Sequence, residues 1–247
     1  MIQRFRKILT LVMMGMVSHA FLYGQERGCN FGKITGIALP SAMITYGFLS
    51  LGNKGIREID FRARHSLEHH HRFWHTQVDN YVQFAPAITA YTLKLRRIES
   101  THNMFDMTVI YGLSNLVSGG ITYKLKVTAE RQRPDNSAHN SFPSGHTETS
   151  FVAAEFLHQE YKNQSVWISI GGYSAAAFVG IARIYNNRHW VSDVVAGAGI
   201  GVLTTKVVYW TYPCVRKVFG KNDKHLHTFV FPEYSDENLS LNLFHTF

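Results

Sequence analysis

Three long stretches of the sequence carry no charged residue, and they set the strongest limit on how the chain can fold. Residues 34–53 and 163–182 each run for about twenty residues, and residues 107–123 run for about seventeen. An apolar helix of about twenty residues is long enough to cross a bilayer. All three stretches are rich in Gly, Ala, Ser and Thr, which let helices approach one another closely. They therefore predict long helices, either in a membrane or in a buried core.

Two further segments extend this pattern. Residues 81–93 are apolar but shorter, and residues 194–205 are followed by Lys206 before residues 207–215 continue the apolar pattern. Both segments have the same small-residue composition as the three longer ones. They bring the number of expected long helices to five, each able to lie in a membrane or in a buried core.

Residues 147–162 have a different character. They carry Glu148, Glu155, His158 and Glu160 among apolar residues, a pattern that predicts an amphipathic helix. The mean hydropathy of the whole chain, −0.10, is low for a protein with six membrane spans. We therefore expect membrane association but leave the number of spans open.

The N-terminus has the composition of an export signal. Three basic residues open it: Arg4, Arg6 and Lys7. The apolar residues 8–17 follow, and residues 18–20 supply small side chains at a cleavage site. We expect residues 1–24 to be a signal peptide, or alternatively an uncleaved first membrane helix. Either reading places the body of the protein in the bacterial cell envelope, with its functional site facing the periplasm.

The C-terminal residues change pattern again. Residues 228–234 and 239–247 alternate polar and apolar side chains, as strands do, and residues 235–238 have turn composition. No linker or internal repeat divides the rest of the chain. We therefore expect one helical domain over residues 25–220 and a tail over residues 221–247 that forms a β-hairpin or packs as a short extension.

Charge and cysteine content limit the ligands. The formal net charge of +8 favours anionic partners, but no basic run with interleaved aromatic residues is present, which argues against nucleic acid. The two cysteines, Cys29 and Cys214, lie too far apart in sequence for a metal-ligand pair. The sequence leaves the oligomeric state open.

A cluster of histidines is the one other candidate for metal binding. Its members are His65, His69, His70, His71 and His75. The last two are four residues apart and could share a metal on a helix. We favour a polar connection or an interfacial helix, and therefore predict no metal site.

The chemistry of the chain lies in three short blocks, and the first two supply positive charge and an anion site. Lys126 and Arg133 are seven residues apart, so a helix would point both cations the same way, and Pro134 ends that helix. In the second block, Ser144 can cap a helix and Gly145 lets the backbone approach a ligand. The free N–H groups of that helix start favour an anion beside His146.

The third block pairs a histidine with a carboxylate. Arg183 ends an apolar segment, and the turn at residues 186–187 precedes His189 and Asp193. A spacing of four puts these last two on one helix face, where the carboxylate can accept the Nδ1 hydrogen of the imidazole. That contact would leave Nε2 of His189 free to act as a nucleophile.

Together the blocks fit phosphoryl transfer. Three cations can neutralise a phosphate and the charge that spreads over its oxygens in the transition state. One histidine can attack while the other protonates the leaving oxygen, so the set requires neither a metal nor a cofactor. The pattern Lys-x6-Arg-Pro, Pro-Ser-Gly-His, Arg-x5-His-x3-Asp resembles the signature of the type 2 phosphatidic acid phosphatase superfamily. That superfamily also includes bacterial acid phosphatases and vanadium haloperoxidases.

The resemblance implies an all-α fold, and with the segments above we expect a bundle of about six core helices. It implies that His189 is the nucleophile, Asp193 its orienting partner and His146 the general acid. It also implies five phosphate-binding residues: Lys126, Arg133, Ser144, Gly145 and Arg183. Two departures bear on substrate choice: Ala182 stands where many members have Ser, and the spacer from Pro134 to Pro143 is short.

The expected activity is therefore hydrolysis of a phosphate monoester or pyrophosphate through a phosphohistidine. A lipid phosphate is the favoured substrate, because the long apolar segments favour a membrane: a phosphatidate, a polyprenyl pyrophosphate or a lipid A phosphate. Three alternatives remain. The protein could be a soluble periplasmic acid phosphatase for small esters, a vanadate-dependent haloperoxidase, or a helical membrane protein that binds phosphate without catalysis.

Overall fold

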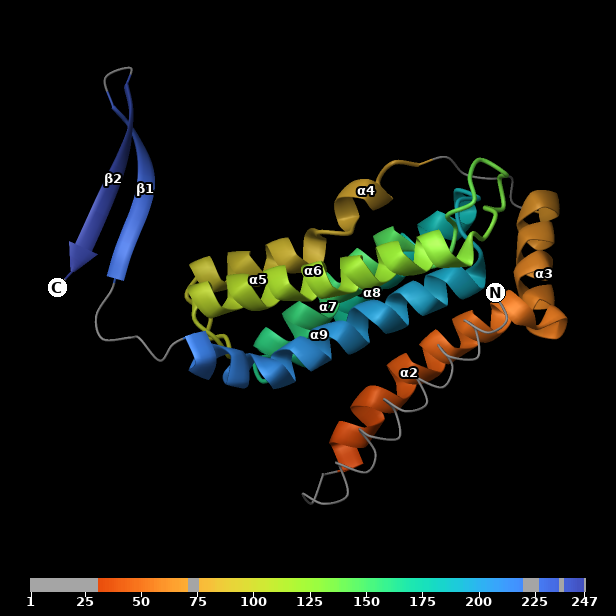
Figure 1. Ribbon diagram of the computed structural model, residues 1–247, viewed down its shortest axis with the longest axis horizontal. Helices are drawn as coiled ribbons and strands as arrows, with labels where there is room; N and C mark the ends of the chain where they lie inside the picture. The colour runs from red at the N-terminus through yellow and green to blue at the C-terminus, as the bar shows by residue number, and fades with distance from the viewer. Residues whose placement is uncertain (1–30, 71–75, 220–226, 236–237, 247) are drawn as a thin grey trace. The chain divides into compact units, whose positions relative to one another are not determined.

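The computed structural model describes residues 31–70, 76–219, 227–235 and 238–246 (Figure 1). Its helices are α2 (Phe31–Gly52), α3 (Lys54–His70), α4 (Asp79–Val82), α5 (Ala85–Leu95), α6 (Met104–Ala129), α7 (Gly145–Tyr161), α8 (Val166–Tyr185) and α9 (Val191–Phe219). The predicted signal peptide and the pair His71 and His75 lie outside the described residues.

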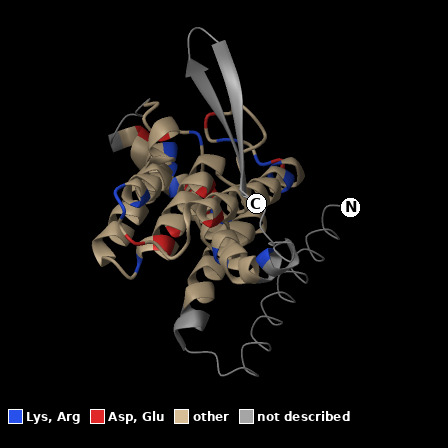
Figure 2. Ribbon diagram, turned by 90° about the vertical axis from the view of Figure 1, so that its left-hand side faces the viewer, with Lys and Arg blue, Asp and Glu red and all other residues tan. Residues whose placement is uncertain are grey.

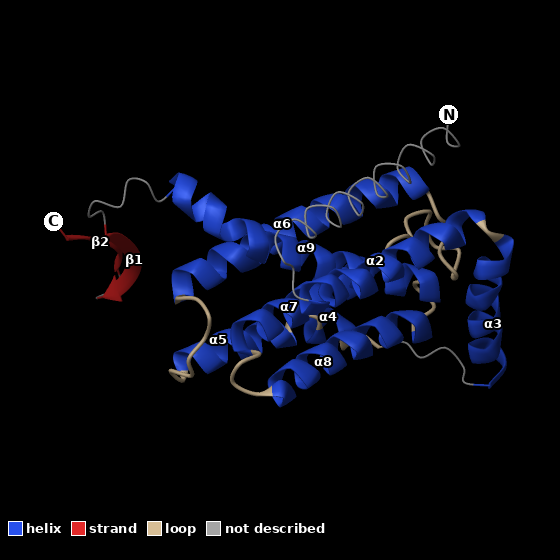
Figure 3. Ribbon diagram, turned by 90° about the horizontal axis from the view of Figure 1, so that it is seen from below, coloured by secondary structure: helices blue, strands red, loops and turns tan. Residues whose placement is uncertain are grey.

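Strands occur within the described residues only at the C-terminus (Figure 3). β1 (His227–Ser235) pairs antiparallel with β2 (Asn238–Thr246), so that Ser235 lies opposite Asn238 and His227 opposite Thr246. The all-α helical bundle predicted from the sequence is confirmed, and the tail, for which a hairpin or a short extension was expected, contains this hairpin. The chain divides into two compact units, Met1–Val208 and Tyr209–Phe247.

The centre of the bundle is α7, which packs against α5, α6 and α8. Its apolar side chains, such as Val152, Phe156 and Leu157, are buried. The prediction of an amphipathic helix here was wrong about its polar face, because the acidic side chains are buried as well. Two of the three have a partner that offsets the cost of burial: Lys206 Nζ lies 2.8 Å from Glu155, and His102 Nδ1 lies 2.8 Å from Glu160.

Glycines bring α9 into backbone contact with α7. A Cβ added to Gly197 would lie 2.5 Å from the carbonyl oxygen of Ser144, and one added to Gly201 would lie 2.5 Å from that of Glu148. Real side chains do not approach so closely, so only glycine allows this packing. Gly197 and Gly201, four residues apart on α9, therefore allow the first half of α9 to pack directly against the start of α7.

Within the part of the chain that the structure describes, two helices are long and apolar enough to cross a membrane. They are α8, over Val166–Tyr185, and the Val191–Pro213 part of α9. Only a third of the α8 window is buried in the bundle, whereas 61% of the α9 window is. Large apolar side chains on other helices are also exposed, including Phe105 and Leu116 of α6. Most of the helical ribbon carries neither sign of charge (Figure 2).

The amphipathic helix α3 lies at the same end of the bundle as the loop of residues 130–144 (Figure 1). One side chain anchors it there. Asp60 is buried and accepts hydrogen bonds from Ser192 N at 2.9 Å and from Ser192 Oγ at 2.6 Å. Because Ser192 lies in the first turn of α9, this contact ties α3 to the segment that carries the third sequence block.

Candidate active site

The structure brings all three sequence blocks to one end of the bundle. Lys126 lies near the end of α6, and its Nζ donates to the carbonyl oxygens of Pro143 at 2.7 Å and Asn140 at 2.9 Å. Ser144 N donates to the carbonyl oxygen of Asp193 at 3.0 Å. These contacts join the first block to the second and the second to the third, although residues 144 and 193 lie far apart in the sequence.

The path of the chain after α6 differs from the prediction. The helix ends at Ala129, and Glu130 adopts a left-handed conformation with φ of 43°. Arg133 therefore lies in the loop, and the helical spacing expected between it and Lys126 is wrong. Its guanidinium is held instead by Asn140, whose Oδ1 accepts from Nε at 2.9 Å. The loop contact, rather than a shared helix face, determines where this cation lies.

The start of α7 offers backbone donors to an anion. Ser144 occupies the N-cap position with extended dihedral angles, but its hydroxyl pairs with Thr147 Oγ1 at 2.9 Å and does not cap the backbone. The first N–H groups of an α-helix have no intrahelical acceptor, and the helix dipole adds positive potential there. Gly145 lies beside Lys126, since an added Cβ would be 3.8 Å from Lys126 Cε. Backbone and ammonium donors therefore converge.

His189 is the buried histidine of this site, with an exposed fraction of 3%. Its Nδ1 lies 2.8 Å from the carbonyl oxygen of Ser141 and 3.7 Å from Asp193 Oδ2. The nearest acceptor is thus the Ser141 carbonyl, and not the carboxylate expected from the sequence. Donation to that carbonyl leaves the lone pair on Nε2. Burial lowers the pKa of His189 to about 4, so the imidazole is neutral at pH 7.

Asp193 acts on His189 through Ser141. Its Oδ2 accepts from Ser141 Oγ at 2.5 Å and from the backbone N of Trp190 at 3.0 Å. Its Oδ1 accepts from Arg131 Nη1 at 2.7 Å. The carboxylate therefore fixes both the residue whose carbonyl orients His189 and the backbone next to His189. These contacts differ from the direct hydrogen bond to His189 that was expected of Asp193.

Arg131 was not predicted from the sequence, yet it links two buried carboxylates. Besides Asp193 it binds Asp60, whose Oδ2 lies 2.7 Å from Arg131 Nη2. Its guanidinium carbon also lies 5.6 Å from the centre of the Trp190 ring. A basic residue two positions before Arg133 was the only sequence signal. Asp60 gave none, because its partner lies 71 residues away.

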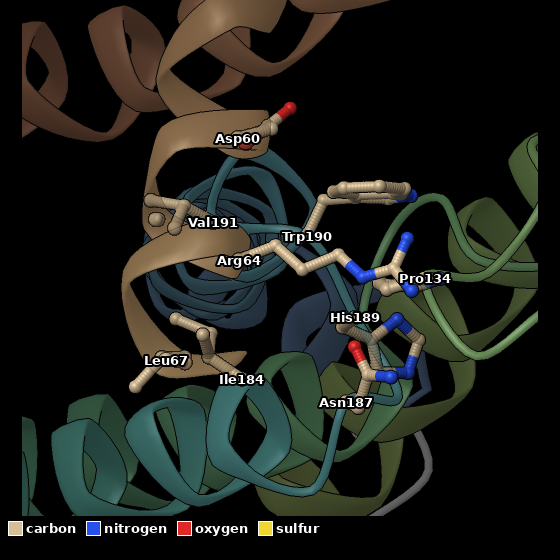
Figure 4. A pocket seen from close by; sticks show the side chains of 10 residues that line it. Asp60, Arg64, Leu67, Pro134, Ile184, Asn187, His189, Trp190 and Val191 are labelled. Atoms are coloured by element: carbon tan, nitrogen blue, oxygen red, sulfur yellow. The ribbon is translucent and has the colours of Figure 1, made fainter. Parts of the chain in front are cut away.

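A pocket opens between α3 and the segment that carries His189 (Figure 4). Asp60, Arg64 and Leu67 line it from α3, and Pro134 and Trp190 line it from the opposite side. Figure 4 shows the Arg64 side chain extending below the Trp190 ring toward Pro134. The helix α3 therefore forms one wall beside His189, a function that the sequence did not reveal.

Arg183 and His146 both contact the short helix α4. Arg183 Nη1 lies 2.7 Å from Asp79 Oδ2, and both side chains are buried. Among the described residues, Nε of Arg183 has no hydrogen-bond partner, so it can donate to an anion. His146 Nε2 lies 2.8 Å from Asn80 Oδ1. Neither Asp79 nor Asn80 belongs to a sequence motif, and both were missed.

Burial and neighbouring cations lower the pKa values of two groups in the site. Burial, and then the charge of Arg133, lower the pKa of Lys126 to about 8. Burial, and then the charge of Arg183, lower the pKa of His146 to about 4. Both lowered pKa values reflect the cost of adding a further positive charge to the site. A bound anion would raise both pKa values again. Within the described residues, no group of three or more His, Cys, Asp or Glu is placed to hold a metal ion.

Binding of inorganic phosphate is expected to weaken above about pH 8. Lys126 is protonated below its pKa of about 8, and its charge is lost as the pH rises through that value. The dissociation constant should therefore rise about tenfold per pH unit above pH 8, as calorimetry can measure. Lys126→Arg keeps its charge at these pH values, so its affinity should stay level. The same decline in both proteins would contradict this assignment.

Comparison with known proteins gives one family and several relatives. Residues 107–217 match the family model of the PAP2 superfamily. The lipid A 1-phosphatase of Porphyromonas gingivalis is 38% identical over 156 residues, which cover 63% of this chain and 34% of that protein. Phosphatidylglycerophosphatase B of Bacillus subtilis is 34% identical over 110 residues, which cover 39% of this chain and 52% of that protein. The chain thus spans about a third to a half of the length of these two relatives.

One solved structure supports the fold. The crystal structure of a transmembrane PAP2 type phosphatidylglycerolphosphate phosphatase from Bacillus subtilis superposes with a TM-score of 0.50. The superposition covers 72% of this chain and 97% of that chain, at 22% sequence identity. At this identity the likeness concerns the helical arrangement alone.

Proposed function

Residues 107–217 belong to the PAP2 superfamily, and on that premise we propose that the protein is a phosphatase that hydrolyses a phosphate monoester or pyrophosphate carried by a lipid. The observation that carries the proposal is the convergence of the three sequence blocks around His189. The imidazole of His189 is neutral and buried. The donors near it come from α6, the loop after α6, the start of α7 and the end of α8. Binding alone would need neither the carboxylate behind His189 nor a second histidine.

In the proposed reaction, His189 Nε2 attacks the phosphorus in line with the leaving oxygen. The low pKa of His189, about 4, keeps its lone pair available at neutral pH. Lys126, Arg133 and Arg183 neutralise the phosphate oxygens, and the N–H groups at the start of α7 add donors. His146 protonates the leaving oxygen and then takes a proton from the water that hydrolyses the phosphohistidine.

A lipid is the proposed leaving group for two reasons. First, an open groove beside Lys126 is lined by Tyr123 and Val127, which are 71% and 57% exposed, together with the polar residues Glu130, His139 and Asn140. Apolar side chains next to a phosphate ligand suit an apolar substrate. Second, the names of the two curated relatives above are those of lipid phosphatases. Phosphatidate, polyprenyl pyrophosphate and lipid A phosphates are the candidates.

The proposed location is the membrane of the bacterial cell envelope, with the site facing the periplasm. The apolar helix α8 and the apolar part of α9 support membrane association. We propose residues 1–24 as the export signal, residues 25–220 as the helical phosphatase domain and residues 221–247 as its tail.

Phosphate release by the purified protein in detergent tests the function. The assay compares a phosphatidate, a polyprenyl pyrophosphate, a lipid A phosphate and a small soluble ester, each with a metal chelator present. We expect a lipid to be turned over with the highest kcat/KM and the chelator to have no effect, because the proposed nucleophile and acid are side chains.

The other outcomes discriminate clearly. Preference for the small ester would replace the proposal by a soluble-substrate acid phosphatase. Loss of activity in chelator would contradict the histidine mechanism. Halide oxidation that appears only with added vanadate, without phosphate release, would make the same residues a vanadate site.

A further inference from the structure

The short helix α4 sets a neutral amide against the proposed general acid. Asn80 Oδ1 lies 2.8 Å from His146 Nε2, although 66 residues separate the two in sequence. The hydrogen bond is a tertiary contact, because α4 and α7 are separate helices. The contact therefore depends on how α4 is held on the bundle.

The position of α4 is fixed by two sets of contacts just before Asn80 in the sequence. The preceding residue, Asp79, is fully buried and binds Arg183 at 2.7 Å. Just before α4, Asn186 binds the backbone of Thr76 twice, accepting from its N and donating to its O, each at 2.9 Å. These bonds tie α4 to the end of α8 and aim Asn80 at His146.

We propose that Asn80 is a positioning residue that holds His146 with a hydrogen on Nε2, so that Nδ1 alone exchanges the proton of the reaction. The amide oxygen is an acceptor, so the ring nitrogen that faces it carries hydrogen. The nitrogen left for proton transfer is Nδ1. This inference rests on the function proposed above and assigns to His146 the atom that acts.

The proton balance closes over both half-reactions. In the first, a bond forms between His189 Nε2 and phosphorus while the bond to the leaving oxygen breaks, and that oxygen takes the proton from His146 Nδ1. In the second, the oxygen of a water molecule bonds to phosphorus as the N–P bond breaks, and the water gives its proton to His146 Nδ1. The hydrogen on Nε2 stays with Asn80 throughout.

An amide at this place orients the ring without adding charge. A carboxylate so close would stabilise the imidazolium and raise its pKa. The charged groups that act on His146 come from four elements: Asp79 of α4, Arg183 of α8, Lys126 of α6 and Arg133 of the following loop. Burial and the three cations lower the pKa of His146 to about 4. The bound phosphate dianion must therefore supply the charge that protonates Nδ1.

The first test compares leaving groups. An alkyl phosphate needs a proton on its leaving oxygen, whereas p-nitrophenolate leaves without one. Asn80→Ala is expected to lower kcat/KM about 10- to 100-fold for the alkyl phosphate, part of what general acid catalysis contributes. For p-nitrophenyl phosphate the loss should stay below about threefold. Equal losses on both substrates would show a merely structural function for Asn80 and overturn the proposal.

The second test does not depend on turnover. The pKa of His146 is measured by NMR titration of the full chain carrying isotope-labelled histidine. The signal of His146 is assigned from its loss in His146→Gln. Asn80→Asp should raise the pKa of His146 by at least about one unit, because an opposite charge at hydrogen-bond distance favours the charged form. Gln77→Glu makes the same chemical change at an exposed residue before α4, and should leave that pKa unchanged.

The two tests separate this inference from the proposed function. A raised pKa in Asn80→Asp, together with a wild-type protein that releases no phosphate from any ester, would retain the contact and reject the phosphatase. An active wild-type protein whose His146 pKa does not respond to Asn80→Asp would reject the positioning function of Asn80 alone.

Discussion

Replacing His189 by alanine is expected to lower the rate of phosphate release from a lipid phosphate by at least about 10³-fold, the order of loss seen when a catalytic nucleophile is removed. The variant should still bind inorganic phosphate, since the cations and the start of α7 remain. The measurement is kcat in detergent with chelator present, beside the binding affinity for phosphate. Loss of turnover with retained binding separates a chemical function from a structural one.

The control for this variant is a second histidine-to-alanine change. His65 is exposed on α3 and its ring contacts that of His69. His65→Ala should retain the activity of the wild-type protein within about twofold, since surface substitutions seldom disturb a fold. Residual activity of His189→Ala within tenfold of the wild type would exclude His189 as the nucleophile.

The second large effect concerns stability. Arg131→Ala is expected to lower the free energy of unfolding by about 3–5 kcal/mol, the usual cost of leaving a buried ion pair without one partner. Here two carboxylates lose their counter-charge at once, those of Asp60 and Asp193. The Asp193 carboxylate, which accepts from Ser141, would also be held less rigidly. Because the Ser141 carbonyl contacts His189, activity should fall together with stability. Thermal denaturation in detergent measures the change.

A double variant makes this prediction specific. Asp60→Asn removes one of the two uncompensated charges, so it should restore part of the stability that Arg131→Ala loses. Arg188→Ala is the matched control, because its ion pair with Asp135 at 3.0 Å is partly exposed and should contribute less than about 1 kcal/mol. An Arg131→Ala protein as stable as the wild type would contradict the network.

The helices and the predicted site residues could be found from the sequence because their signals are local. Charge-free runs mark α2, α6 and α8, and the three blocks give residue types at fixed spacing. The prediction was less successful where a contact decided the outcome. Arg133 leaves the helix because the backbone turns at Glu130, and Asp193 reaches His189 through Ser141.

Apart from Arg131 and Ser141, the contacts that could not be predicted come from the segment before residue 103. Asp60, Asp79 and Asn80 each contact a site residue at least 66 positions away, and none belongs to a motif. A carboxylate on an amphipathic helix has the same appearance in sequence whether it faces solvent or a buried arginine. The buried glutamates of α7 were misjudged for the same reason, since Lys206 comes from α9 and His102 from the loop before α6.

Trapping the covalent intermediate tests the central claim most directly. The wild-type protein is mixed with a lipid substrate carrying a radiolabelled phosphate, quenched within milliseconds in alkali, and digested for mass spectrometry. We predict a phosphoryl group on His189, stable in alkali, labile in acid, and absent from His189→Ala. Rapid turnover by the wild-type protein with no labelled peptide, or a label on any other residue, would contradict the account.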